Sequence, residues 1–432
     1  MRPAKRPFRP RVLVPGLSLL AFAAACTAPD AANTAAADAT VFEGARIIVG
    51  DGSEPIENGV FLVENGRFTR VGRAGEIEVP AGAQRVDLAG KTVMPALINT
   101  HVHLATTRDS LTGQLEHFAY YGVGAVQSLG HDSSAVSLEM RAETIPGAAR
   151  YLTAGRGITG PEPGRTEAPY WISSEEQART AVQELAAKQI NLIKIWVDDR
   201  NGQVQKLSPA LYGAVIEEAH RNGQRVAAHI FSLEDAKGLL RAGIDAFAHS
   251  VRDMDIDEEG MALFREHPNF VLVPNLPDRG VVTDLSWLSG TVPAERLQEM
   301  QSNATDRPEV QQRFAIQGRN LAKLSEAGVR ITMGTDGSAP WAAHQEMEDM
   351  AASGMTPAQV IVAATRNSAE FLRLTDMGTV EAGKSADFLV LDANPLDDIK
   401  NTRQISAVYL RGVTMDRDAV SARLMAPTTP TP

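Results

Sequence analysis

The chain has 432 residues, of which 44% are hydrophobic and 22% are charged, and its formal net charge is −11 at pH 7. This composition is typical of a globular protein with one large and one smaller domain, and no repeat or low-complexity block dominates it. The acidic balance and the lack of a Lys/Arg cluster exclude nucleic acid from the expected partners.

The N-terminal segment differs from the rest of the chain. Basic residues without any acidic one come first, and the apolar run VLVPGLSLLAFAAA then leads to Cys26. This pattern predicts a signal peptide over residues 1–25 that is too short for a membrane span. Because AFAAAC resembles a bacterial lipobox, we expect Cys26 to be the lipid anchor of a lipoprotein at the periplasmic face of a bacterial membrane. The alternative is ordinary cleavage after Ala25, which would give a soluble periplasmic or secreted protein. Residues 26–40 predict a flexible tether.

Short β-like runs separated by turns occupy residues 41–93. The turns are marked by DG or NG dipeptides at 51–52, 58–59 and 65–66. They favour a small antiparallel sheet. A similar pattern returns over residues 376–416, in GTVEAGKSADFLVLDANPL and ISAVYLRGV. Together the two segments predict one small β-sandwich domain built from both chain ends, followed by a tail over residues 417–432.

The middle of the chain, residues 94–375, alternates strand-like runs with helix-like stretches. The strand candidates are VMPALIN, GAVQSLG, RYLTAG, NLIKIWV, RVAAHI, AFAHS, FVLVPNL and RITMGTD. Helical patterns such as SEEQARTAVQELAAKQ lie between several of them, and Gly or Asn closes most of these helices. Eight β/α units over this length predict an α/β fold with a (β/α)8 TIM barrel.

Side chains with metal-binding or unusual chemistry stand at the carboxyl ends of five of these strands, and they are His101, His103, Lys194, His229, His249 and Asp336. In a barrel, those strand ends open onto one face, where active sites are built. His101 and His103 are two residues apart on an extended strand, so both rings point the same way and can share a cation. Lys194 interrupts a buried strand, where a lysine is disfavoured unless it is paired or chemically modified. Each histidine alone could be a core residue and Asp336 a helix cap, but together the residues predict a metal site.

With this set of residues, the chain resembles the amidohydrolase superfamily. VMPALINTHVH is similar to the superfamily motif VxPGLIDxHxH, with Ala96 in place of Gly and Asn99 in place of Asp. GTVEAGKSADFLVLDANPL resembles its C-terminal β segment, so the likeness spans about residues 41–413. LIKIWVDD, RVAAHIF and AGIDAFAHS are most similar to imidazolonepropionase-like proteins and to Xaa-Pro dipeptidases (prolidases) with a carboxylated lysine.

The resemblance implies a binuclear metal site. Lys194 would react with CO2 to form a carbamate that bridges two divalent ions, with Zn2+ as the first expectation and Mn2+ or Co2+ as alternatives. One ion would take the HxH pair and Asp336, and the other would take His229 and His249. A hydroxide shared by the ions would attack the substrate carbonyl, and Asp336 would pass its proton to the leaving group.

The favoured reaction is hydrolysis of an amide or peptide bond in a small molecule, such as a dipeptide or an N-acyl amino acid. Esters, lactones, carbamates and cyclic amides are alternatives, because the same hydroxide can attack them. Deamination is disfavoured because Lys194 is present and the first acid after His229 is Glu234. A different class, a binding lipoprotein without catalysis, is disfavoured by the intact set of ligands.

Residues in the loops after the strands are candidates for substrate contacts, and they are His131, Arg156, Tyr170, Trp171, Asn275 and His344. An arginine there could bind a substrate carboxylate, although each of these residues could instead serve loop packing or a solvated face. Contact with a membrane is expected only through the N-terminal lipid, and a homo-oligomer is left open.

Overall fold

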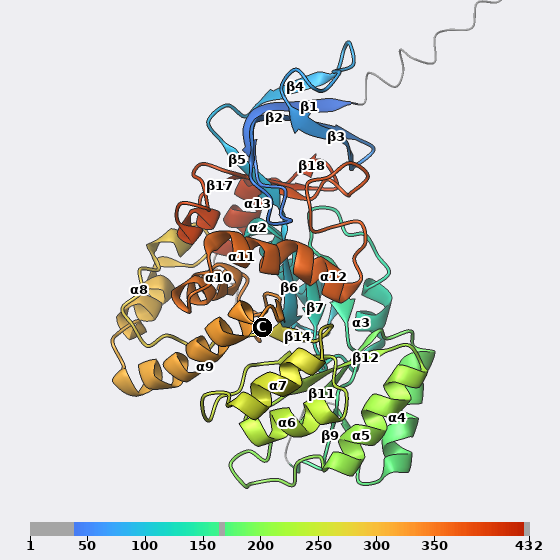
Figure 1. The fold of residues 1–432 in the computed structure, drawn as a ribbon. Helices are drawn as coiled ribbons and strands as arrows, with labels where there is room; N and C mark the ends of the chain where they lie inside the picture. The colour runs from blue at the N-terminus through green and yellow to red at the C-terminus, as the bar shows by residue number, and fades with distance from the viewer. Residues whose placement is uncertain (1–38, 164–168, 427–432) are drawn as a thin grey trace, which may run out of the picture.

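A computed structural model of the protein describes residues 39–163 and 169–426 (Figure 1). The predicted signal peptide, Cys26 and almost all of the predicted tether lie outside these described residues. Within the described ranges, no helix has both the length and the apolar character that a membrane crossing requires.

Strands from both ends of the chain form one mixed sheet, which Figure 1 shows at one end of the molecule in blue and red. The strand order is β18-β17-β16-β5-β1-β2-β3, and β4 also pairs with β1. The strands are β1 (Thr40–Ile47), β2 (Ile56–Glu64), β3 (Arg67–Arg73), β4 (Gln84–Asp87), β5 (Thr92–Pro95), β16 (Phe388–Leu391), β17 (Ile405–Leu410) and β18 (Val413–Thr414). Asn65 and Gly66 both have positive φ and connect β2 to β3, as an NG turn predicts.

The pairing of β1 corrects the expectation of a purely antiparallel sheet. The first half of β1 pairs in parallel with β4, and its last two residues pair in parallel with β5. A register shift at Gly44 separates the two halves. One edge of β1 is therefore shared by two strands, and the sheet branches there. Aromatic rings from β1, β2 and β16 pack together at this branch, with the centroids of Phe42 and Phe61 4.8 Å apart.

Two parallel sheets occupy the middle of the chain, with the orders β6-β7-β8 and β10-β9-β11-β12-β13-β14-β15. Their strands are β6 (Leu97–Val102), β7 (Val123–Ser128), β8 (Arg150–Thr153), β9 (Ile158–Thr159), β10 (Tyr170–Trp171), β11 (Leu192–Trp196), β12 (Arg225–His229), β13 (Ala246–Ala248), β14 (Val271–Val273) and β15 (Arg330–Ile331). Each predicted strand segment overlaps one of these strands. The Thr100 N–H donates to the Met333 carbonyl at 2.8 Å, which joins β6 to the segment after β15. At the other edge, residues 154–157 lead directly from β8 into β9. The arrangement is a TIM-barrel-like α/β fold.

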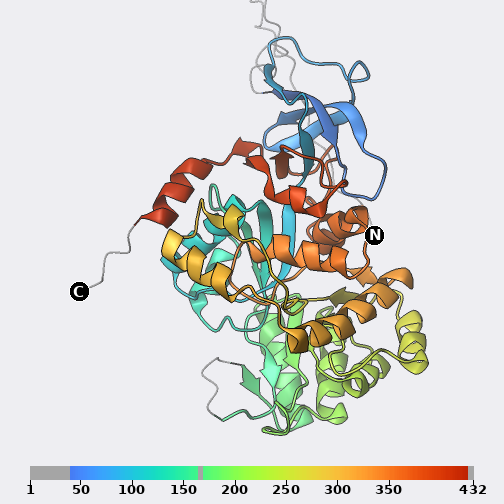
Figure 2. The same cartoon turned by 90° about the vertical axis from the view of Figure 1, so that its left-hand side faces the viewer.

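Helices cover the outer side of the parallel strands, as the two views in Figures 1 and 2 show. They are α2 (Arg108–Tyr120), α3 (Ala135–Met140), α4 (Glu175–Ala187), α5 (Pro209–Arg221), α6 (Leu233–Arg241), α7 (Glu258–Glu266), α8 (Ala294–Asn303), α9 (Pro308–Glu326), α10 (Ala342–Ala352), α11 (Pro357–Val362), α12 (Ser368–Leu372) and α13 (Arg417–Met425). Serine hydroxyls at residues 174, 208 and 232 cap α4, α5 and α6 by accepting a backbone N–H three residues later. Much of the predicted tail forms α13, which is tied to α2 by an ion pair of 2.6 Å between Arg423 and Glu116.

Alternate residues of the parallel strands face two separate cores. On β11, Ile193 and Ile195 pack in the core that includes the helices, whereas Leu192 packs with Ala227 and other small residues in a second core. Because successive side chains of a strand point to opposite faces, Lys194 lies on the same inner face as Leu192. The sequence alternation predicted this placement. Alanines on the inner face leave space there for larger polar side chains.

Candidate metal centre

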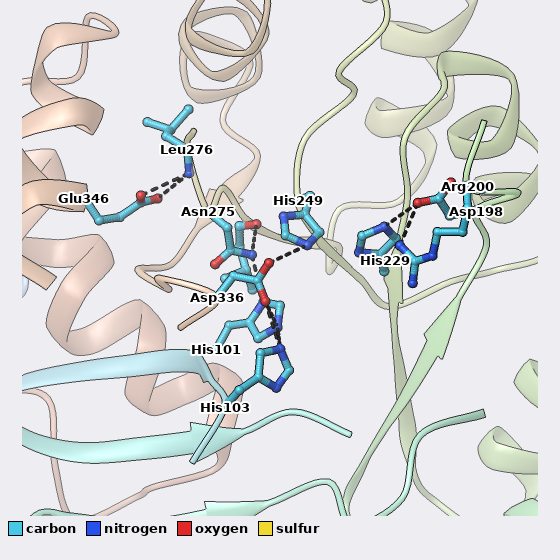
Figure 3. A network of polar contacts seen from close by, with 11 residues as sticks. His101, His103, Asp198, Arg200, His229, His249, Asn275, Leu276, Asp336 and Glu346 are labelled. Atoms are coloured by element: carbon cyan, nitrogen blue, oxygen red, sulfur yellow. Dashed lines mark hydrogen bonds and ion pairs between the residues drawn. The ribbon is translucent and has the colours of Figure 1, made fainter. Parts of the chain in front are cut away.

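Asp336 lies at the centre of the predicted metal-binding side chains (Figure 3). Its Oδ1 is 3.0 Å from His101 Nε2 and 2.8 Å from His103 Nε2, and its Oδ2 is 3.3 Å from His249 Nε2. Both rings of the HxH pair therefore point at one carboxylate, as their spacing on β6 predicts. His101, His249 and Asp336 each offer a ligand atom within 4.8 Å of the other two, which is a geometry that can hold a metal ion.

Unusual backbone conformations aim the side chains at the strand ends. His249 (φ 122°), Asn275 (φ 45°) and Asp336 (φ 52°) all have positive φ values, which residues other than glycine rarely adopt. The Asp336 N–H donates to the His101 carbonyl at 2.9 Å, so the segment after β15 is fixed against β6. Backbone strain of this kind persists only where the surrounding structure holds it, and it concentrates at functional sites.

His229 lies beside this cluster but turns toward a second acid (Figure 3). Its Nε2 donates to Asp198 Oδ2 at 3.0 Å, and Arg200 donates to the same oxygen at 3.0 Å. The ring centroids of His229 and His249 are 4.7 Å apart. Because Nε2 is engaged by Asp198, Nδ1 is the nitrogen of His229 that can bind a cation. A carboxylate that orients a histidine through its other nitrogen is a common support for metal ligands.

Lys194 is buried between these two groups of residues. The side chain is 1% exposed, and its charge acts on both His101 and His229. Two glycines make room for it and for the indole of Trp196 on the same strand face. A Cβ atom at Gly130 would lie 2.8 Å from Lys194 Cγ, and one at Gly157 would lie 2.1 Å from Trp196 Cζ3. The chain therefore keeps space for a lysine at a place where burial disfavours its charge.

Burial and neighbouring charges set the protonation states of the cluster. Burial, together with the charge of Lys194, lowers the pKa of His101 to about 3. Burial also lowers the pKa of His229 to about 4 and places the pKa of His249 well below its ordinary value. Burial alone would raise the pKa of Asp336, but its contacts with His101 and His103 outweigh burial and hold this pKa well below its usual range. Neutral imidazoles and an ionised carboxylate are the forms that bind a metal ion.

His131 is the predicted substrate contact that lies at the cluster. Its ring stacks on His103 with centroids 4.1 Å apart and on Trp196 with centroids 5.5 Å apart. Its backbone forms an isolated bridge with Arg156, which connects the loops after β7 and β8. The side chain is thus stacked directly against a predicted metal ligand, where it can meet a substrate.

Arg156, Tyr170 and Trp171 form a separate group at the ends of β9 and β10. The Arg156 guanidinium lies 4.0 Å from the centroid of the Tyr170 ring, and the Tyr170 hydroxyl donates to Glu184 Oε2 at 2.8 Å. Trp171 is 44% exposed. The group offers an aromatic and cationic surface, and its role in substrate contact stays a prediction.

Asn275 and His344 occupy positions other than those expected. Asn275 Nδ2 donates to His101 Nδ1 at 2.9 Å, so this amide orients a metal ligand. The predicted substrate contact at His344 is corrected to a structural role, because its buried ring donates through Nε2 to the Tyr121 carbonyl at 2.9 Å and meets Thr402 Oγ1 through Nδ1 at 3.0 Å. Both ring nitrogens are thus used inside the protein.

Asp198 and Glu346 support the site although the sequence pattern did not single them out. Asp198 follows Lys194 and Trp196 at the spacing of one strand face, so strand alternation could have indicated it. Buried Glu346 accepts the Leu276 N–H at 3.0 Å and thereby fixes the backbone just after Asn275 (Figure 3). Burial raises the pKa of Glu346 well above its ordinary value.

Comparison with known proteins identifies the family of the chain. The model of the amidohydrolase family matches residues 92–415. An imidazolonepropionase from Deinococcus radiodurans is 26% identical over 385 residues, which cover 83% of this chain and 92% of that protein. The structure of a "putative prolidase" from Bifidobacterium longum is similar with a TM-score of 0.72 and 29% identity, covering 90% of this chain and 100% of the other. A Xaa-Pro dipeptidase with bound methionine shares the fold at a TM-score of 0.69 and 23% identity, covering 87% of this chain and 99% of the other. The chain therefore belongs to the amidohydrolase family, in its imidazolonepropionase- and prolidase-like branch.

Proposed function

We propose that this protein is a metal-dependent hydrolase that cleaves an amide or peptide bond in a small molecule. The observation that carries the proposal is the cluster of His101, His249 and Asp336, whose ligand atoms lie within 4.8 Å of one another at the carboxyl ends of parallel strands. Family membership supports hydrolysis, and the prolidase name given to a similar structure supports a peptide-like substrate.

We further propose a binuclear centre with Zn2+ as the preferred metal and Mn2+ or Co2+ as alternatives. The HxH pair and Asp336 would hold one ion, His229 and His249 would hold the other, and a carbamate on Lys194 would bridge them. The donor set fits, because the buried histidines are neutral and a carbamate would replace a buried cation with an anion. Metal ions bound there would polarise the substrate carbonyl and lower the pKa of water.

The protein's own groups then handle protons and orientation. Asp336 is ionised and its side chain is 36% exposed, so it can accept a proton from the attacking water and return it to the leaving amine. His131 stacks on His103 and would contact the substrate there, and Asn275 holds the His101 ring in place. We also propose that the two parallel sheets close into a complete (β/α)8 barrel, which would keep these groups rigid relative to one another.

The experiment is a substrate panel on the mature protein loaded with metal. The panel contains Xaa-Pro dipeptides, other dipeptides, N-acyl amino acids, aryl amides, esters and lactones. Hydrolysis of at least one amide or peptide is expected. Protein that holds metal but cleaves no amide or peptide would reject the proposal, and turnover of esters or lactones alone would reassign the bond class.

We propose that the mature chain is exported and held at a bacterial membrane by a lipid on Cys26. The basic, apolar and lipobox-like sequence of residues 1–26 supports this location. Metabolic labelling with palmitate tests it. Label should appear on the wild-type protein and disappear in Cys26→Ser, whereas an unlabelled wild-type protein would contradict the lipid anchor.

A further inference from the structure

The chain just after β11 fixes Asp198 beside His229 (Figure 3). Asp198 Oδ1 accepts the Arg200 backbone N–H at 2.9 Å, and its Oδ2 accepts both the Arg200 guanidinium and His229 Nε2 at 3.0 Å. Both carboxylate oxygens are therefore engaged, and the side chain of Asp198 is only 13% exposed. Asp198 can turn away from the ring that it orients only by breaking its bonds to Arg200.

The backbone at Arg200 has an unusual shape. Arg200, Asn201 and Gly202 have φ values of 54°, 59° and 78°, so three successive residues adopt the left-handed conformation. Residues other than glycine rarely adopt it, and such strain persists only where the surrounding structure holds it. A glycine at position 200 would relieve the strain and keep the backbone bond to Asp198, but it would lose the guanidinium.

Arg200 also reaches the segment that follows β9, residues 160–163, which we call the post-β9 segment. The Arg200 Nε donates to Glu162 Oε1 at 3.1 Å, and the side chain of Glu162 is 16% exposed. The two stretches of chain pack closely, because a Cβ atom at Gly160 would lie 2.6 Å from the Gln205 carbonyl oxygen. One guanidinium thus joins the carboxylate of the post-β9 segment to the carboxylate that orients His229.

The other half of the proposed centre has separate supports. Asn275 Nδ2 donates to His101 Nδ1 at 2.9 Å, and the Asp336 N–H donates to the His101 carbonyl at 2.9 Å. Neither of these contacts involves Arg200. A change at Arg200 should therefore act on the half of the centre to which His229 belongs.

We propose that Arg200 is a positioning residue that links the post-β9 segment to His229 through Asp198, and that it sets the cation affinity of the His229 half of the centre. Because Asp198 accepts a hydrogen bond from His229 Nε2, Nδ1 is left as the nitrogen that binds a cation. Arg200 keeps this arrangement by holding both Asp198 oxygens. The inference rests on the proposed binuclear centre and assigns a support to one of its two ions.

Titration of the metal-free mature protein with Zn2+ tests the proposal. The variant is Arg200→Gly, because glycine fits the backbone at this position. One ion should bind about ten- to a hundredfold more weakly than in the wild-type protein, and the other ion should bind as before. Arg200→Lys should keep part of the affinity, because lysine retains the charge without the planar fork. Equal weakening of both ions, or unchanged affinity for both, would overturn the proposal.

Glu162→Gln tests the link to the post-β9 segment. It should weaken the same ion about two- to tenfold, as expected for the loss of one charged hydrogen-bond partner. It should add nothing to Arg200→Gly, because residues in one network do not act independently. Fully additive effects of the two changes would overturn this link.

Arg150→Gln is the matched control for the loss of a guanidinium that grips a carboxylate. Arg150 donates to both oxygens of Asp376 at 2.8 and 2.9 Å, and its side chain is 28% exposed, against 32% for Arg200. It stands at the amino end of β8, away from the strand ends that carry the metal ligands. The variant should keep both affinities, and a selective loss as large as that of Arg200→Gly would overturn the assignment to Arg200.

Nitrogen NMR of the histidine-labelled, metal-free protein separates this inference from the proposed centre. The His229 ring should carry its hydrogen on Nε2 in the wild-type protein and should lose this preference in Arg200→Gly. An unchanged tautomer in Arg200→Gly would overturn the role of Arg200 in a protein that still binds two ions. Wild-type protein that binds fewer than about one ion per chain would reject the proposed centre, and the tautomer would then decide the role of Arg200 by itself.

Discussion

Removal of the Asn275 side chain perturbs the metal centre at one defined contact. In Asn275→Ala the 2.9 Å hydrogen bond to His101 Nδ1 disappears, and both groups are buried. An unsatisfied buried nitrogen costs about 1–3 kcal/mol of folding stability. Alanine at φ 45° adds about 1 kcal/mol of backbone strain, which Asn275→Gly avoids. Loss of a residue that orients a metal ligand lowers metal affinity by roughly ten- to a hundredfold.

Two assays separate these effects. Competition with a chelator measures Zn2+ affinity, and chemical denaturation of the metal-free protein measures the free energy of unfolding. The Zn2+ affinity should fall by the same factor in both Asn275 variants, and Asn275→Gly should be the more stable of the two. Asn222→Ala is the control, since it removes a 2.9 Å bond to the Glu218 carbonyl before the amino end of β12, on the opposite side of the strands. Unchanged Zn2+ affinity in both Asn275 variants would refute the orienting role.

Further variants test the packing at Gly157, the pH dependence of folding stability at Asp349 and the role of Asp198. Gly157→Ala places a Cβ 2.1 Å from the Trp196 indole, so thermal unfolding should reveal a loss of about 1–3 kcal/mol in folding stability. The control is Gly113→Ala, whose Cβ would have nothing within 4 Å and which should lose no stability. Equal melting temperatures for the two variants would contradict the steric reasoning. Burial raises the pKa of Asp349 to about 7, so the folded state holds a proton that the unfolded chain releases near pH 4, and stability from this group falls as pH rises between these values. Asp349→Asn should make stability less dependent on pH over this range, and an equal effect of the mutation on urea unfolding at pH 5 and pH 8 would count against it. Asp198→Asn should weaken binding of one metal ion about tenfold or more in a metal titration, because His229 loses its orienting carboxylate. A metal titration curve of Asp198→Asn that matches the wild-type curve would exclude the orienting role of Asp198.

Strand alternation predicted the core of the site. His101 and His103 share a strand face by their spacing, and Lys194 shares one with Leu192, so local periodicity was enough to place them on the inner side. The convergence of Asp336 on these residues followed from the rule that the ends of parallel strands meet at one face. These patterns depend on local residue spacing, so they can be read from the sequence without the tertiary structure.

Long-range packing decided the features that the sequence did not predict. The branch of the mixed sheet depends on which strands meet along β1, and the turn residues do not encode that choice. His344 follows Asp336 closely in sequence, but α10 carries its ring into the core against Tyr121.

Metal content tests the central claim most directly. Elemental analysis of the mature protein, purified after growth with Zn2+ or Mn2+, should give about two ions per chain, as a binuclear centre requires. Lys194→Ala should lose metal and amide hydrolysis together, with partial recovery when a small carboxylic acid replaces the carbamate. Fewer than about one ion per wild-type chain, or full activity in Lys194→Ala, would contradict the binuclear account built on that lysine.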